Sequence, residues 1–264
     1  MLVISSLQNP AIKLIRSLVE KKYRQQTGLF IAEGEKVLER ASTLGWTPET
    51  LVSVAPPPPW GDSRLLQVAP EIMARLSTQK NPPATLAVFR QKWQESATPD
   101  GLWLALEEMR DPGNLGAIIR TADAAGAKGI ILAGPSCDPW GSDCVRATMG
   151  SIFAVPLVQM SVASLIGFCQ SWPSDVAGAH LQATEDYRRT YREPTLLVIG
   201  SETSGLSPEL AEACSVLVRI PMRGAIDSLN VSVATGLMLF ETQRSKRHLH
   251  PSPGKAGRRC PEGG

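Results

Sequence analysis

LVIGSETSGLSPEL, residues 197–210, carries the most informative pattern in this chain. An apolar run leads into Gly200, Glu202 and Gly205, and Ser207-Pro208 then marks the first turn of a helix. This order predicts a strand, a loop and a helix. Glycines at the end of a strand let the backbone approach a ligand closely, so the loop is a candidate binding element. Taken alone, the stretch is equally explained as a plain strand-turn-helix connection.

Two further segments place polar, glycine-containing sequence directly after an apolar run. In DPGNLGAIIRTADAAGA (111–127), Asp111 to Asn114 predict a turn that also starts a helix. In RIPMRGAIDSLNVSVATGLMLFE (219–241), Ser228 is the expected N-cap of a long helix. Open α/β sheets bind ligands at the carboxyl ends of their strands, so the three segments together predict one site. Each alone is also explained by a turn or a capped helix.

Strands and helices alternate around these segments from residue 102 onward. The expected strands are almost continuously apolar and lie at 102–108, 129–134, 153–159, 175–181, 195–202 and 215–221. Helical patterns lie between and after them, at 115–126, 143–150, 161–172, 208–214 and 230–244. This alternation predicts an α/β domain, residues 102–247, with a parallel sheet covered on both faces.

The first 93 residues predict a second, smaller α/β domain. A basic amphipathic helix is expected at 10–26, followed by further strands and helices. The strands are expected at 29–34, 51–55, 65–69 and 85–90, and the helices at 35–45 and 71–77. The polar stretch QESATPDG (94–101) is the expected linker, and residues 248–264 predict a disordered basic tail.

Composition excludes several classes of protein. The 264 residues are 43% hydrophobic and 20% charged, close to ordinary globular values, so collagen-like, coiled-coil and wholly disordered chains are excluded. No run reaches the roughly 18 apolar residues of a membrane helix, and the first residues lack the order of a signal peptide. We therefore expect a cytoplasmic protein without a membrane partner.

Several motifs are absent, and their absence excludes several kinds of active site and cofactor site. The five cysteines form no CxxC pair and the three histidines are scattered, so we expect no metal site, disulfide framework or Ser/His/Asp triad. No two glycines are separated by one residue, which removes the GxGxxG dinucleotide fingerprint, and no P-loop motif occurs.

Charge is concentrated at the two ends of the chain. Residues 1–30 hold five basic side chains and one acidic one, and residues 242–264 hold six and one. Acidic residues outnumber basic ones between these segments. Basic ends on an acidic body indicate a polyanion bound through its phosphates, although solvated termini that aid solubility remain the alternative.

Taken together, the three segments resemble the motifs of the SpoU/TrmH family of RNA ribose 2'-O-methyltransferases, part of the SPOUT superfamily. The resemblance spans about residues 102–242 and rests on Asn114, Gly116 and Arg120, on Gly200, Glu202 and Gly205, on Ile220-Pro221-Met222, and on Ser228-Leu229-Asn230-Val231. LFIAEGEKVLERA, near the amino terminus, is similar to an RNA-binding domain with a ribosomal-protein-like fold. Two positions depart from the family pattern: Thr203 stands where glycine is common, and Ala154 where a basic residue is frequent.

The resemblance implies a trefoil-knotted methyltransferase domain that binds S-adenosylmethionine. Gly200, Ile220, Met222 and Leu229 are the implied cofactor-binding residues. The implied catalytic residues are Asn114, Arg120, Glu202, Ser228 and Asn230. A guanidinium rarely gives up its proton, so we expect Arg120 to clamp a phosphate or the developing alkoxide rather than act as a base. The polar residues would orient the ribose and Arg120, whereas Glu202 would either hold its loop or pair with Arg120.

The resemblance also implies a homodimer in which Arg120 of one subunit completes the site of the other. Expected RNA contacts are Arg146, whose alternative role is surface solubility, and Lys21, Lys22 and Arg24 in the basic amino-terminal segment. Ribosomal RNA is the expected substrate because the amino-terminal module suits a folded RNA. Transfer RNA, and a catalytically silent RNA-binding protein, are the alternatives.

Overall fold

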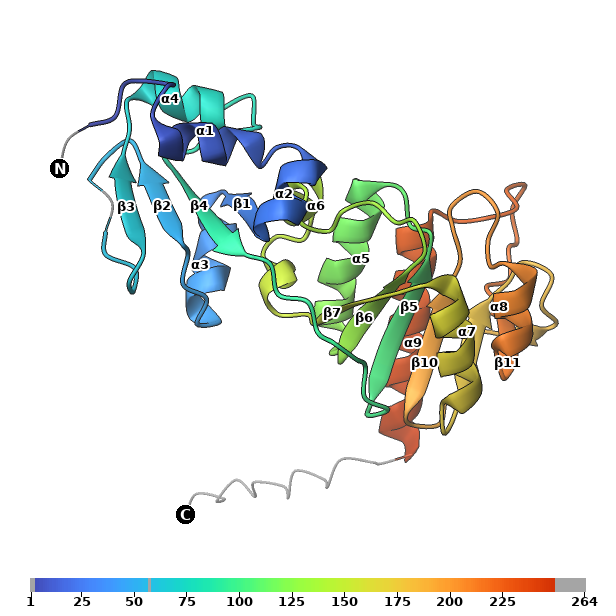
Figure 1. Ribbon diagram of the computed structural model, residues 1–264. Helices are drawn as coiled ribbons and strands as arrows, with labels where there is room; N and C mark the ends of the chain where they lie inside the picture. Colours follow the sequence, from blue (N-terminus) through green and yellow to red (C-terminus); the bar gives the residue numbers. More distant parts are fainter. Residues whose placement is uncertain (1–2, 57, 250–264) are drawn as a thin grey trace, which may run out of the picture.

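The computed structural model describes residues 3–56 and 58–249, which form two sheets with helices around them (Figure 1). The smaller sheet has the order β1-β4-β2-β3, and the larger one the order β7-β6-β5-β10-β8-β11-β9. Residues 91–101 connect β4, the last strand of the smaller sheet, to β5, the first of the larger.

The amino-terminal sheet pairs its strands both ways. β4 is antiparallel to β1 and to β2, and β2 is parallel to β3. The strands are β1 (Leu29–Glu33), β2 (Thr50–Ser53), β3 (Arg64–Gln67) and β4 (Thr85–Arg90). The helices are α1 (Pro10–Ser17), α2 (Lys21–Thr27), α3 (Glu35–Thr43) and α4 (Pro70–Leu76). Apolar side chains of α1 and α4 pack together on one face of this sheet, and those of α3 cover the other.

The single helix expected at 10–26 is in fact two helices. The chain leaves helical geometry after Ser17 and re-enters it at Lys21. The Arg24 guanidinium donates to the carbonyl oxygens of Leu18 and Val19, at 2.8 and 2.7 Å. This buried side chain therefore satisfies backbone acceptors that the break leaves without a helical partner.

The carboxyl-terminal sheet is parallel throughout, as its apolar strands predict. Its strands are β5 (Leu102–Glu107), β6 (Gly129–Ala133), β7 (Leu157–Met160), β8 (Val176–Ala179), β9 (Glu185–Asp186), β10 (Thr195–Ile199) and β11 (Val216–Arg219). The helices are α5 (Pro112–Ala124), α6 (Ser142–Ala147), the short η1 (Ser151–Phe153), α7 (Val162–Ser171), α8 (Pro208–Ala213) and α9 (Val231–Leu249).

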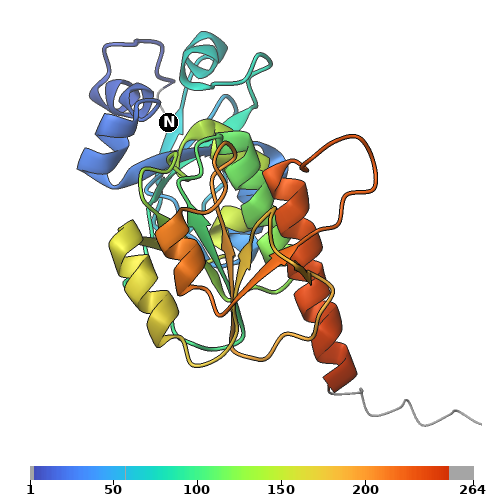
Figure 2. The same cartoon turned by 90° about the vertical axis from the view of Figure 1, so that its right-hand side faces the viewer.

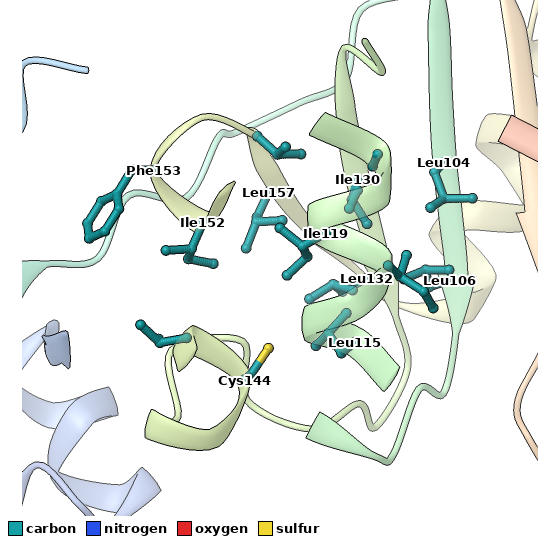
Figure 3. Close-up of a cluster of buried hydrophobic side chains, with 14 of the residues drawn as sticks. Leu104, Leu106, Leu115, Ile119, Ile130, Leu132, Cys144, Ile152, Phe153 and Leu157 are labelled. Atoms are coloured by element: carbon teal, nitrogen blue, oxygen red, sulfur yellow. The ribbon is translucent and has the colours of Figure 1, made fainter. Parts of the chain in front are cut away.

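Two helical layers cover this sheet (Figure 2). Alternate residues of β5 face opposite layers: Leu104 and Leu106 belong to the core under α5 and α9, and Trp103 and Ala105 to the core under α7 and α8. Figure 3 shows the first of these cores, where Ile119 of α5 lies close to Ile130 and Leu157 of the sheet.

Many element ends differ from expectation by one to three residues, and other differences are larger or have an identifiable cause. Strand β7 begins at Leu157 rather than at residue 153, because residues 151–153 form a 3-10 turn and Pro156 cannot join a ladder through its nitrogen. The two-residue strand β9 was not expected. Helix α9 starts at Val231, so its N-cap is Asn230 and not Ser228, and it runs to Leu249, so the boundary expected at residue 247 falls inside it. The remainder of the expected tail, 250–264, lies outside the described residues.

The two sheets share one hydrophobic core. Phe30 of β1 packs against Trp140 with 4.7 Å between ring centroids, and Phe89 of β4 packs against Phe153 at 4.9 Å. The indole nitrogen of Trp46 donates to the Phe153 carbonyl oxygen at 2.9 Å. Because aromatic side chains bury large areas, these contacts hold the two domains in one fixed arrangement.

Candidate functional site

A cavity of about 530 Å³ opens where β8, β10 and β11 end and α9 begins. This edge is the carboxyl end of the parallel sheet, where the sequence predicts a site. The volume lies within the range of about 300–1,000 Å³ found for small-molecule sites. The expected cofactor-binding residues Gly200, Ile220, Met222 and Leu229 all line the cavity, as does Ser228.

The loop after β10 folds back tightly upon itself. Backbone hydrogen bonds join Ser201 and Gly205 in both directions, at 3.0 and 3.1 Å. A Cβ on Gly200 would lie 2.0 Å from the Gly205 carbonyl carbon, so no side chain fits there. Gly205 has φ +70°, which favours glycine. Thr203, at the position where the family pattern often has glycine, lies in the turn of this loop. The loop therefore closes without a glycine at that position.

Glu202 joins this loop to the start of α5. Its carboxylate accepts from the backbone amides of Arg110 and Asp111, both at 3.3 Å, and from Asn114 Nδ2 at 3.5 Å. A carboxylate is favoured here because the amides at a helix N-terminus carry partial positive charge. These hydrogen bonds tie the loop after β10 to the start of α5.

Asn114 links Glu202 to the start of α9. Its Oδ1 accepts from Asn230 Nδ2 at 3.0 Å, and Asn230 Oδ1 accepts from the Ser232 amide at 2.8 Å, which caps α9. Asn114, Glu202 and Asn230 thus form one hydrogen-bonded chain across the three sequence segments.

Arg120 lies apart from this chain. It is six residues beyond Asn114 on α5, which turns its side chain about 120° away around the helix axis. The side chain is exposed, does not line the cavity, and makes no hydrogen bond or ion pair with the part of the chain described. Gly116 has a packing role instead, because a Cβ there would lie 2.5 Å from the Ala147 Cβ on α6.

Sequence reasoning missed two contributors to the site. Residues 179–182, the last residue of β8 and the three that follow it, also line the cavity, and His180 Nδ1 accepts from the Gln182 amide at 3.2 Å. Their place at the carboxyl end of an expected strand was the available signal. The second is Glu107, a buried residue that ends β5 and accepts from the Ser207 amide at 2.8 Å. It thereby fixes the chain where the 200–205 loop enters α8.

Both domains of the chain match known protein families. Residues 101–240 match the SpoU rRNA Methylase family. The chain belongs to that family. Residues 9–87 match the MRM3-like substrate binding domain.

Relatives of this SpoU family member resemble it along most of its length. The AdoMet-bound rRNA methyltransferase from Sinorhizobium meliloti is 39% identical with a TM-score of 0.85, over 92% of this chain and 97% of that one. The 23S rRNA (guanosine(2553)-2'-O)-methyltransferase RlmP of Bacillus subtilis is 29% identical over 90% of this chain and 97% of its own. The SpoU methyltransferase AviRb from Streptomyces viridochromogenes, in complex with AdoMet, has 28% identity and a TM-score of 0.80, over 90% of this chain and 98% of that one.

The residues expected to contact RNA in this SpoU family member differ in their surroundings. Lys21 and Lys22 are exposed on α2, and Arg146 on α6 pairs with Asp143 at 2.7 Å while staying 44% exposed. The expected RNA contact of Arg24 is not consistent with the surroundings of its side chain. Its side chain is only 6% exposed and its Nε donates to Asp138 at 2.7 Å, so it joins the two domains and offers no cation to RNA.

The described part of the chain holds neither a cluster of metal-binding side chains nor a membrane-spanning helix. Among the side chains described between residues 3 and 244, no three His, Cys, Asp or Glu gather as a metal site requires. Over the same residues, no helix combines the length and apolar character needed to cross a bilayer.

Proposed function

We propose that this protein transfers a methyl group from S-adenosylmethionine to a ribose 2'-hydroxyl of RNA, with ribosomal RNA as the substrate. One observation carries the proposal. The cavity at the carboxyl ends of β8, β10 and β11 is bordered by the hydrogen-bonded chain of Glu202, Asn114 and Asn230. The RNA and the cofactor named for the relatives support the substrate and the methyl donor.

The cavity lining fits S-adenosylmethionine. Ile199, Ile220 and Leu229 offer apolar surface for an adenine ring, and residues 200–205, which also line the cavity, offer backbone amides and carbonyls for its polar edge. When bound, the cofactor supplies a methyl group on a positively charged sulfur. Glu202, which also lines the cavity, adds a carboxylate that complements this charge.

The polar chain would act by positioning. A ribose hydroxyl is a weak acid, so its attack needs precise alignment and stabilisation of the developing negative oxygen. Asn114 and Asn230, held by each other and by Glu202, would orient the ribose next to Ser228. Arg120 would clamp the neighbouring phosphate or the developing alkoxide through its planar fork.

We propose that the active form is a homodimer with Arg120 acting in the partner's site. Arg120 is exposed, lacks a partner among the described residues and stays out of its own subunit's cavity. Three large apolar side chains on one face of the adjacent helix α9, Val233, Leu237 and Phe240, are between 40% and 53% exposed. Burial of this face against a second copy would bring an α5 helix of one subunit beside the other.

Further parts of the proposal concern the division of the chain. Residues 1–93 would bind RNA, 94–101 would connect the domains and 102–247 would carry out the transfer.

Threading of the chain from 195 to 241 into a trefoil knot is supported by the strand order, in which β10 lies between β5 and β8. A cytoplasmic place of action follows from the proposed ribosomal RNA substrate.

The test is methyl transfer from tritiated S-adenosylmethionine to unmodified ribosomal RNA and, separately, to transfer RNA. We expect label in ribosomal RNA only, and its loss in Arg120→Ala but not in Lys128→Ala, an exposed cation just before β6, at the sheet edge opposite the cavity. Label only in transfer RNA would keep the chemistry and change the substrate. No label in either, together with no binding of the cofactor by calorimetry, would leave a silent RNA-binding protein.

A further inference from the structure

A second, smaller cavity of about 90 Å³ lies between the two domains. It opens at the carboxyl ends of β6 and β7, on the same edge of the parallel sheet as the larger cavity. Residues of helix α2 and of the segment after β4 line it from the amino-terminal side, so both domains build it. The lining residues used below are Lys21, Gln25, Gln91, Trp93, Trp140 and Gln159. We call this cavity the interdomain niche.

Three glutamine side chains give the niche its polar character. Gln91 Nε2 donates to the carbonyl oxygens of Arg24 and Leu29, both at 3.2 Å, which leaves Gln91 Oε1 as a fixed acceptor. Gln25 and Gln159 are exposed, and their side chains make no hydrogen bond with the described part of the chain. Each therefore has an amide donor and acceptor available, the groups that read the edges of unpaired bases.

Aromatic surface accompanies these amides. Trp93 is 37% exposed although it packs against Trp140, with ring centroids 5.7 Å apart and planes at 86°. The buried indole nitrogen of Trp140 has no acceptor within the described residues. Proteins that bind single-stranded RNA stack its bases on such exposed aromatic rings.

A cation completes the niche. Lys21 lies one helical turn before Gln25, on the same side of α2, and both line the niche. Lys22 is exposed beside it. The Lys21 amine can pair with a phosphate, the glutamine amides can hydrogen-bond a base edge, and the Trp93 ring can stack on a base face. The niche therefore offers a contact for each part of one nucleotide.

The niche is connected to the candidate active site through the backbone. Cys137, which lines it, donates to the Met109 carbonyl oxygen at 2.7 Å. The next residue, Arg110, donates its amide to Glu202. One RNA strand lying along this sheet edge would therefore meet both cavities.

We propose that the interdomain niche binds an unpaired nucleobase of the RNA substrate, flanking the nucleotide whose ribose is methylated. This inference rests on the proposed RNA methyltransferase function. It assigns to Trp93 the stacking surface, to Gln25, Gln91 and Gln159 the reading of the base edge, and to Lys21 the phosphate.

Binding of fluorescein-labelled, single-stranded homopolymers of U, C and A, followed by anisotropy, tests the niche without any methyl transfer. We expect Trp93→Ala to weaken binding by about 5- to 150-fold, the effect of removing one base stack, and Trp93→Phe to restore most of it. The double variant Gln25→Ala/Gln159→Ala should lose any preference among the three homopolymers. Gln26→Ala, on the same helix but outside the niche, is the matched control and should bind as the wild type does.

The outcomes separate this proposal from the proposed function. Binding by Trp93→Ala as tight as that of the wild type, together with an unchanged preference among the homopolymers in the double glutamine variant, would overturn the niche, whatever the methylation assay gives. Weakened binding by Trp93→Ala and a lost preference in the double glutamine variant, each with unchanged S-adenosylmethionine affinity, would support it, since the unchanged affinity shows that the fold is intact. If wild type methylates no RNA but the niche variants still weaken binding, the niche stands and the methyl transfer fails.

Discussion

Asn230 Nδ2 donates to Asn114 Oδ1 at 3.0 Å, which joins two residues 116 positions apart at the mouth of the cavity. Asn230 is the N-cap of α9 and Asn114 lies in the first turn of α5, so this single bond aligns the starts of two helices. Glu202 extends the alignment to the loop after β10. The starts of α5 and α9 are consequently set by the same side chains that border the proposed reaction site.

Asn114→Asp should disrupt this chain. It replaces the amide that donates to Glu202 with a second carboxylate about 3.5 Å away, and like charges at that distance repel. We expect methyl transfer at pH 8 to fall at least about tenfold, with partial recovery toward pH 5 as one carboxyl takes up a proton and can donate again. A pH series of initial rates checks this, with Asn114→Ala as the control that cannot recover. An Asp variant as active as wild type at pH 8 would contradict the role of the chain.

Gly200→Ala should abolish binding of S-adenosylmethionine. The added methyl would lie 2.0 Å from the Gly205 carbonyl carbon, so the loop must open. The matched control is Gly167→Ala on α7, where a Cβ meets no atom within 4 Å. That change should stabilise the protein by up to about 1 kcal/mol, because alanine favours a helix over glycine. Calorimetric titration and thermal unfolding measure the two effects.

A mixture of two inactive variants should regain activity if Arg120 acts across the dimer. Arg120→Ala and Asn230→Ala are each expected to be inactive alone. After unfolding and refolding together, half of the dimers are mixed, and each holds one site with an intact cavity and an intact partner arginine. We expect about a quarter of the wild-type rate, as the symmetry of a two-fold dimer dictates. Absence of activity in the mixture, with mixed dimers verified by a tag, would place Arg120 in its own subunit's site.

Arg24→Met should destabilise the protein far more than removal of a surface arginine. The Arg24–Asp138 pair is almost buried, with side chains 6% and 11% exposed, and the substitution leaves Asp138 without its cation. The expected loss in the free energy of unfolding is about 3–5 kcal/mol. Arg90→Met breaks the exposed pair with Glu49 and should cost less than about 1 kcal/mol. Urea unfolding compares the two, and equal losses would show that Arg24 does not hold the domains.

The described cysteines should react slowly with iodoacetamide. Burial raises the pKa of the Cys137 thiol to about 11 and those of Cys169 and Cys214 to about 12. At pH 8 only about one Cys137 in a thousand is then the reactive thiolate. Because these folded pKa values exceed that of an unfolded thiol, stability is unaffected below about pH 8.5 and falls as pH rises toward 11. Mass spectrometry of the Cys260→Ser protein measures the modification, and rapid labelling at pH 8 would refute the burial.

Local patterns predicted much of the fold and the site. Apolar strands between helical patterns gave the parallel sheet, and polar segments after them gave the edge where the cavity lies. Periodicity did not reveal the break after Ser17, because the break is stabilised by hydrogen bonds from the Arg24 side chain to the backbone, which an apolar repeat does not record. The N-cap of α9 was placed at Ser228 rather than Asn230 because serine and asparagine cap equally well, and only the contact with Asn114 selects between them.

Charge counting predicted RNA contacts without distinguishing buried from exposed cations. Arg24 and Lys22 contribute equally to the basic amino-terminal segment, yet only Lys22 is exposed. The amides that Glu202 accepts from leave no mark in the sequence, since every residue except proline has one. Such contacts between distant segments emerge only when the chain is folded.

The aromatic contacts between the two sheets bear on the choice of nucleotide. Because Phe30, Trp140 and Phe153 belong to one core, the span from the exposed lysines of α2 to the large cavity is set when the chain folds. Under the proposed function, an RNA that contacted both would have to match that span with its own three-dimensional shape. A ribose of suitable chemistry at the wrong spacing along a stem would then remain out of reach, so the protein would select its target by length as well as by contact.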